Sequence, residues 1–92
     1  MTNYQLEVYS RPTCSDCQNL KQFLRAHSIS YTEYDLSEQP EKEQDLKKIT
    51  GSRIVPALVF SRPAFMGIKR KRTSMIGFEQ NEEKIRTLLN IT

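Results

Sequence analysis

Apolar and polar side chains alternate along residues 4–9, where Tyr4, Leu6 and Val8 share one face, and this period of two predicts a β-strand. The period changes after residue 14. From residue 15 to about residue 27, apolar positions recur three and four residues apart, which predicts an amphipathic helix. The apolar stripe of that helix consists of Cys17, Leu20, Phe23, Leu24 and His27.

The rest of the chain repeats these two patterns. Residues 29–36 are rich in β-branched and aromatic side chains and predict a second strand. A helix with an acidic start and a basic end should follow at once, with Gly51 as its C-terminal cap. Residues 54–60 and 69–76 predict two further strands, and Asn81 is expected to cap a last helix. The predicted order of elements is therefore βαβαββα.

Composition is that of a globular protein. The chain has 92 residues, of which 37% are hydrophobic and 27% charged, so we expect one domain spanning residues 1–92. Its net charge is 14 − 11 = +3, which does not by itself indicate a nucleic-acid partner. The first residues lack the pattern of a signal peptide, and no apolar run reaches the ~20 residues of a membrane span. We therefore expect a cytoplasmic protein with no membrane partner.

Both cysteines lie between the first predicted strand and the first predicted helix, as Cys14-Ser15-Asp16-Cys17. At the start of a helix, free backbone N–H groups and the helix dipole stabilise a thiolate. Cys17 comes one turn later, within reach of a mixed disulfide formed at Cys14. In a reducing cytosol such a pair indicates catalysis or metal binding rather than a structural disulfide. His27, the only histidine, is expected to be a helix-end cation.

Three motifs together resemble the glutaredoxin family, in the short form of the thioredoxin fold. Residues 9–17 resemble its active-site segment, and residues 50–56 resemble the segment that leads to its cis-proline. Ile76-Gly77-Phe78 stands in the place of its glycine pair. The resemblance implies an α/β, thioredoxin-like fold, with a central four-stranded mixed sheet and helices on both faces.

The resemblance also implies a thiol–disulfide oxidoreductase that reduces protein or small-molecule disulfides. Its catalytic residues would be Cys14, the nucleophile, and Cys17, which resolves the mixed disulfide. The implied substrate-binding residues are Arg11, Thr13, Val55, Pro56, Gly77 and Phe78. We expect the Val55-Pro56 bond to be cis and to offer a backbone edge to the substrate. Phe78 could equally serve as an apolar contact at the rim or as part of the core.

Some residues depart from the usual glutaredoxin pattern. Ser15-Asp16 replaces the Pro-Tyr pair between the cysteines, and the turn of residues 77–80 lacks the residues that hold a γ-glutamyl group. That turn is closer to the one in NrdH-type redoxins, which take electrons from thioredoxin reductase. The implied reductant is thioredoxin reductase with NADPH, or a low-molecular-weight thiol such as glutathione, which Arg11 could bind by its carboxylate. We expect no bound cofactor, no metal and a monomer.

Two other classes of function stay open at this point. The cysteine pair could belong to a zinc or iron–sulfur module shared across a dimer, because tetrahedral zinc needs four ligands. The basic run of residues 69–72 could contact nucleic acid, although no aromatic residues are interleaved with it. The insert of residues 62–72 is longer than the hairpin usual in short redoxins, and the topology predicts that it lies far from the cysteines. Near them, Arg11 should favour a thiolate and Asp16 should oppose it.

Overall fold

The computed structural model describes residues 4–62 and 72–91. Its strands and helices follow the predicted order βαβαββα, with a short 3-10 turn, η1 (Glu79–Asn81), inserted before the last helix. The elements are β1 (Gln5–Ser10), α1 (Ser15–Ala26), β2 (Thr32–Asp35), α2 (Lys42–Thr50), β3 (Ala57–Ser61), β4 (Arg72–Ile76) and α3 (Glu82–Leu88). This is the α/β, thioredoxin-like architecture that the sequence predicts.

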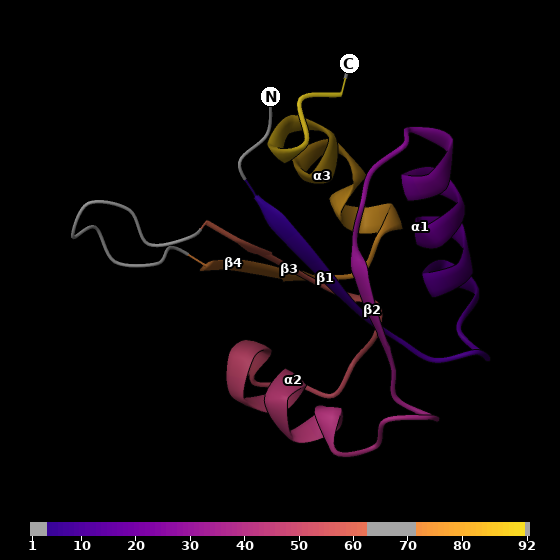
Figure 1. Cartoon of the computed structure of the whole chain (residues 1–92), viewed down its shortest axis with the longest axis vertical. Coiled ribbons are helices and arrows are strands. Elements are labelled where there is room, and N and C mark those ends of the chain that lie inside the picture. Colours follow the sequence, from indigo (N-terminus) through magenta and orange to yellow (C-terminus); the bar gives the residue numbers. More distant parts are fainter. Residues whose placement is uncertain (1–3, 63–71, 92) are drawn as a thin grey trace.

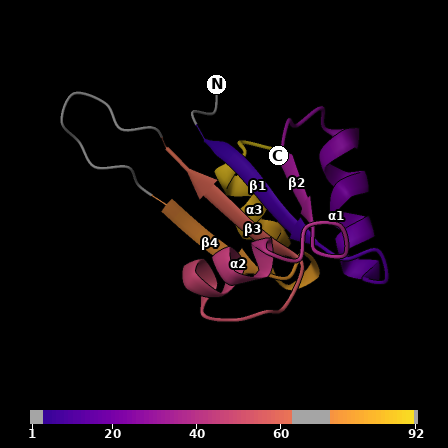
Figure 2. The ribbon, with the colours of Figure 1, turned by 60° about the horizontal axis from the view of Figure 1, so that its bottom comes forward.

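The four strands form one mixed sheet in the order β2-β1-β3-β4. The β1 strand pairs with β2 in parallel and with β3 antiparallel, and β3 pairs antiparallel with β4. Figure 1 shows α1 and α3 on one face of the sheet and α2 on the other, and Figure 2 shows α2 from its own side. The sheet is therefore covered on both faces, and its central strand β3 is buried throughout.

Each face of the sheet carries its own apolar cluster. Beneath α1 and α3, the buried residues are Leu6, Val8, Leu20, Leu24, Leu58, Phe60, Phe78, Ile85 and Leu89. Beneath α2, they are Tyr9, Leu36, Leu46, Ala57 and Val59. At the C-terminal end of β1, successive side chains therefore point into two different buried clusters. The second face is buried there because α2 covers Tyr9.

Most predicted boundaries agree with the structure, and Gly51 caps α2 in the left-handed conformation with φ 79°, as expected. The α2 helix begins at Lys42 instead of directly after the strand. Asp35 explains the delay, because its carboxylate accepts hydrogen bonds from both the backbone N–H and the hydroxyl of Ser37 and closes a local turn. The second strand is also shorter than predicted. The backbone N–H of Ile29 donates to the carbonyl of Leu24 at the end of α1, so residues 29–31 precede the strand.

One predicted cap has a different role. Asn81 occupies the N-cap position of α3 but makes no side-chain cap bond there. Its amide instead donates to the carbonyls of Ile76 and Gly77, at 2.6 and 3.0 Å, and so holds the turn between β4 and η1. None of the helices in the described segments is long and apolar enough to cross a membrane.

Candidate active site

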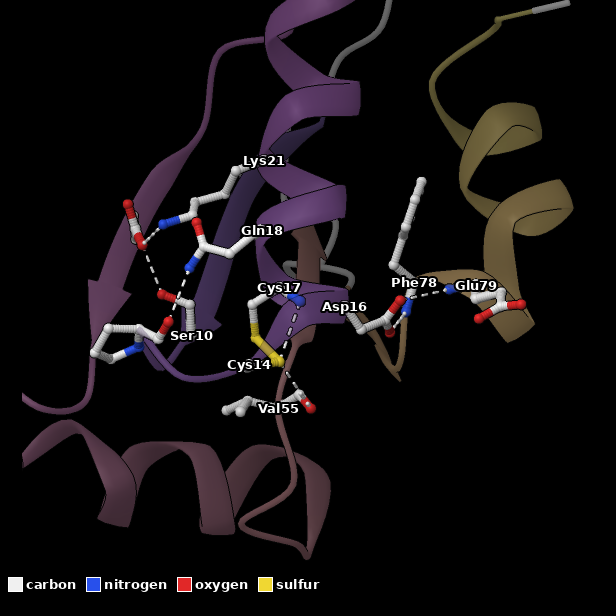
Figure 3. Close-up of a disulfide and its surroundings, with 11 residues drawn as sticks. Ser10, Cys14, Asp16, Cys17, Gln18, Lys21, Val55, Phe78 and Glu79 are labelled. Atoms are coloured by element: carbon white, nitrogen blue, oxygen red, sulfur yellow. Dashed lines mark hydrogen bonds and ion pairs between the residues drawn. A yellow bond between two sulfur atoms is a disulfide. The ribbon is translucent and has the colours of Figure 1, made fainter.

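Cys14 and Cys17 are joined by a disulfide at the N-terminus of α1 (Figure 3). Cys14 is the N-cap residue, with extended backbone dihedrals, and its Sγ accepts the backbone N–H of Cys17 at 3.1 Å. Cys14 is partly exposed, whereas Cys17 is fully buried under the helix. The two sulfur atoms therefore differ in access, and the outer sulfur is the one held against a free helix N–H.

The loop before Cys14 is short and held by its own backbone. The N–H of Cys14 donates to the carbonyl of Arg11 at 3.2 Å, which closes a tight turn over Pro12 and Thr13. The Gln18 side-chain amide reaches back to the carbonyl of Pro12 at 3.5 Å. Pro12 and Thr13 are both exposed. Thr13, the residue directly before Cys14, is therefore open to solvent.

The second motif lies directly against the cysteines. The Val55-Pro56 bond is cis, which confirms the prediction. The carbonyl oxygen of Val55 lies 3.8 Å from the Sγ of Cys14, while Pro56 is buried at the start of β3. The preceding residue, Ile54, is 61% exposed and is the large hydrophobic residue that stands out on the described surface.

The third motif adjoins the second, because the backbone N–H of Gly77 donates to the carbonyl of Pro56 at 2.7 Å. Gly77 has φ 93°, and a Cβ at this position would lie 2.6 Å from the Nε2 atom of Gln80. The turn therefore requires glycine. The side chain of Phe78 is only 8% exposed and packs into the core, with its ring 5.1 Å from that of Phe23. The side chain of Phe78 is therefore part of the core and not an apolar contact at the rim of the site.

Asp16 makes a contact that the sequence does not reveal. Its carboxylate accepts the backbone N–H of Phe78 at 2.8 Å and that of Glu79 at 3.3 Å, and it thereby ties the cysteine loop to the turn before η1 (Figure 3). The sequence predicts that Asp16 places a negative charge near Cys14 and partly opposes its thiolate. These two N–H dipoles offset part of that charge and hold the carboxylate on the side of the site that faces Glu79.

Arg11 is also engaged. Its guanidinium lies 3.2 Å from the carboxylate of Glu43 on α2, and Arg53 approaches the same carboxylate at 3.8 Å. Since Arg11 and Glu43 are each about one-third exposed, solvent screens the pair and its contribution to stability is small. Part of the positive charge expected beside Cys14 is therefore neutralised within the fold, and the cluster of Arg11, Arg53 and Glu43 keeps a net positive charge.

A partly buried polar network supports the loop from behind. Ser10, at the end of β1, donates its hydroxyl to Glu33 on β2 at 2.6 Å, and Lys21 on α1 donates to the same carboxylate oxygen at 2.9 Å. Burial alone would raise the pKa of Glu33, but the hydrogen bonds from Lys21 and Ser10 outweigh it and hold the pKa below its usual range. These three residues fasten the middle of α1 to the sheet, and no spacing in the sequence links them.

A surface groove of about 560 Å³ opens beside the disulfide, between the Val55 segment and the Gly77 turn. Its lining residues are Asp16, Ile54, Val55, Ile76, Gly77, Glu79 and Gln80. The groove thus has lining residues from all three sequence motifs. In the described segments, no group of three or more His, Cys, Asp and Glu side chains is placed to hold a metal ion. The basic residues Lys69, Arg70 and Lys71 lie outside the described residues.

Comparison with known proteins gives a consistent result. Residues 6–62 match the family model for glutaredoxin. The glutaredoxin-like protein NrdH of Lactococcus lactis subsp. cremoris (strain MG1363) is 32% identical over 62 residues, which make up 67% of this chain and 85% of that protein.

Solved structures agree over nearly the whole chain. A mutant of the thioredoxin-like protein BC3987 aligns with a TM-score of 0.71 and 27% identity, covering 96% of this chain and 97% of the other. The buckwheat glutaredoxin–glutathione complex aligns with a TM-score of 0.62 and 25% identity, covering 95% of this chain and 74% of the buckwheat protein.

Proposed function

The chain belongs to the glutaredoxin family, and on this basis we propose that it is a thiol–disulfide oxidoreductase working through Cys14 and Cys17. The Cys14 thiolate attacks a substrate disulfide, forms a mixed disulfide and releases one substrate thiolate. The Cys17 thiolate then attacks the Sγ of Cys14 and releases the second. The protein's two thiols lose two electrons and become the Cys14–Cys17 disulfide, and the substrate disulfide gains both electrons.

The asymmetry of the two sulfur atoms carries this proposal. Cys14 is partly exposed and lies against the N–H of Cys17, whereas Cys17 has no exposed surface. A nucleophile needs access and a stabilised thiolate, and a resolving thiol needs only to reach the nucleophile's sulfur. In the proposed cycle, Cys14 therefore attacks the substrate disulfide, and the buried Cys17 attacks the Sγ of Cys14.

We assign substrate contacts to the surface around Cys14. The half-buried residue Val55, next to Pro56, offers a backbone edge along which an extended substrate segment can pair as an additional strand. Gly77 permits close approach on the other side, and Phe78, which is only 8% exposed, supports that turn from the core. Arg11 and Thr13 form the third side, where Arg11 remains able to attract an anionic group despite its pairing with Glu43.

For the electron source, we propose thioredoxin reductase with NADPH, in a cytoplasmic, monomeric protein. Two observations support this choice over glutathione. The 32%-identical relative is an NrdH protein, and the backbone N–H groups of Phe78 and Glu79 are already occupied by Asp16. Glutathione is the alternative, supported by the likeness to a buckwheat glutaredoxin that was solved as a glutathione complex.

The experiment is to supply oxidised protein with NADPH and thioredoxin reductase in one reaction, and with glutathione, glutathione reductase and NADPH in another. NADPH consumption is followed with insulin as the disulfide substrate. We expect saturable consumption in the first system and slow consumption in the second. Cys14→Ser should abolish both. Fast, saturable reduction by glutathione alone would reverse the choice of reductant, and activity in Cys14→Ser would overturn the proposed chemistry.

A further inference from the structure

The groove beside Cys14 combines apolar walls with charge of a single sign. Ile54, Val55 and Ile76 supply the apolar surface, and Ile54 is 61% exposed. The two charged residues in the lining, Asp16 and Glu79, are both acidic, and no described lining residue is cationic. Any group that enters this groove while its disulfide is attacked at Cys14 therefore meets negative charge.

The position of the Asp16 carboxylate is fixed rather than adaptable. Its two oxygens accept the N–H groups of Phe78 and Glu79, at 2.8 and 3.3 Å, from a turn 62 residues away in the sequence. Figure 3 shows the carboxylate between the disulfide and the Phe78-Glu79 backbone. Glu79 is exposed, and its side chain makes no ion pair with the described residues. One held carboxylate and one exposed acidic residue therefore line the same groove.

A small cluster of the opposite sign includes Arg11 of the cysteine loop. Arg11 and Arg53 share the single carboxylate of Glu43, so these three side chains together keep a net positive charge. The Gln80 amide adds no charge to the groove, and its Nε2 donates a hydrogen bond to the carbonyl of Ile76 at 2.7 Å. The charges near Cys14 thus differ in sign. The apolar groove carries acidic residues, and the cluster of Arg11, Arg53 and Glu43 is basic.

We propose that Asp16 and Glu79 determine substrate choice, so that the groove accepts disulfides bearing a cationic or neutral group near the attacked sulfur and disfavours those bearing a carboxylate. For a protein substrate, the matching segment has apolar and basic side chains beside its cysteine. This inference rests on the proposed thiol–disulfide exchange, in which the Cys14 thiolate forms the mixed disulfide, Cys17 resolves it, and both substrate sulfurs leave as thiolates.

Three small disulfides of matched length test the inference: cystamine, with two ammonium groups; hydroxyethyl disulfide, which is neutral; and dithiodipropionate, with two carboxylates. Reduced protein is mixed with each at neutral pH and low salt, quenched with an alkylating reagent and analysed by mass. The second-order rate constant with hydroxyethyl disulfide serves as the reference for each variant. Dividing by this reference removes any change in the reactivity of Cys14. Comparing variant with wild type for the same disulfide then removes the difference between leaving groups.

In Asp16→Asn, the normalised rate constant with cystamine should fall about threefold and that with dithiodipropionate should rise about threefold, the effect of one unit charge roughly 6 Å away in water. Glu79→Gln should move both rate constants in the same directions. Glu79 contacts the described structure through its backbone N–H, so this variant tests the inference even if Asp16→Asn unfolds. Glu38→Gln, which removes an exposed carboxylate outside the groove, is the matched control.

The outcomes separate the two proposals. Equal changes for all three disulfides, or the same changes in Glu38→Gln, would overturn the role of the groove while leaving disulfide exchange intact. Failure of reduced wild-type protein to react with any of the three would instead overturn the proposed function, and the inference with it. Selectivity that follows Asp16 and Glu79 and weakens with added salt is the expected result.

Discussion

The backbone N–H of Cys17 points at the Sγ of Cys14 across 3.1 Å, inside the first turn of α1. In the reduced protein this N–H, together with the helix dipole, favours a thiolate on Cys14. Cys17 has no exposed surface and no comparable opening to solvent.

Reduced protein treated with iodoacetamide near neutral pH should therefore be alkylated at Cys14 at least about ten times faster than at Cys17, because the thiolate is the nucleophile and only one sulfur is accessible. Peptide mapping by mass spectrometry distinguishes the two positions. Equal rates at the two cysteines in folded protein would contradict the assignment of roles. Equal rates in urea are the control, since unfolding removes the difference in access.

Ile54 provides a second prediction, because it exposes 61% of its surface on the wall of the groove. Ile54→Ser should lower kcat/KM for insulin reduction about fivefold, which corresponds to roughly 1 kcal/mol of lost apolar contact. The effect on hydroxyethyl disulfide should be smaller, because that molecule is too short to cover the wall. Ile54→Val keeps most of the apolar surface and should stay within about twofold of wild type. Equal losses on both substrates would show that Ile54 acts on the cysteines rather than on substrate docking.

The features that follow from short stretches of sequence were predictable. The strand-to-helix junction at Cys14 and the left-handed cap at Gly51 each depend on neighbouring residues with strong local preferences. The cis bond at Val55-Pro56 was expected from the resemblance to the glutaredoxin family, since local preference favours the trans isomer. Their order along the chain then indicated the fold, and the sheet order and its covering helices confirmed it.

The contacts that complete the site were not predictable, because they join residues far apart with no periodic signal. Asp16 reaches Phe78, Arg11 reaches Glu43, and Ser10 reaches Glu33, across separations of 62, 32 and 23 residues. Each side chain read alone is an ordinary surface residue. Only the packing of α1, α2, β2 and the Gly77 turn brings the partners together.

Tyr9 predicts a pH dependence of stability. It is 2% exposed, and burial, followed by repulsion from the Glu7 carboxylate, raises its pKa from 10.0 to about 12. A raised pKa stabilises the folded state at pH values below the ordinary pKa, and this stabilisation is lost as the pH rises from about 10 to about 12. The difference in unfolding free energy between wild type and Tyr9→Phe should therefore change by about 2 kcal/mol over that interval.

Urea titrations followed by circular dichroism at pH 9 and pH 12 measure this difference. Wild type should lose stability more steeply than Tyr9→Phe, because the phenylalanine has no proton to release. Parallel losses in the two proteins would show that Tyr9 does not titrate differently on folding. Tyr31→Phe serves as the control, since Tyr31 is partly exposed.

The basic run at residues 69–71 lies outside the described residues, but its flanks are placed. Ser61 pairs with Arg72 at one end of the β3–β4 hairpin, and Ala57 pairs with Ile76 at the end beside the cysteines. Four residues at about 3.3 Å each separate these ends by about 13 Å, more than the Debye length of about 8 Å at physiological salt.

Replacing Lys69, Arg70 and Lys71 together with glutamine should therefore leave the alkylation rate of Cys14 within about twofold of wild type. Any slowing should be confined to acidic protein substrates and should disappear at high salt. A large change in Cys14 alkylation would mean that the segment reaches the active site.

The central claim, that Cys14 attacks and Cys17 resolves, is tested most directly by intact-mass analysis of reduced Cys17→Ser and Cys14→Ser proteins after reaction with hydroxyethyl disulfide. Cys17→Ser should retain one hydroxyethylthio group, mapped to Cys14, and release one equivalent of mercaptoethanol. Wild type should carry no adduct, form the Cys14–Cys17 disulfide and release two equivalents, and Cys14→Ser should stay essentially unmodified. Rapid adduct formation at Cys17 in Cys14→Ser, or a stable adduct on wild type, would contradict the account.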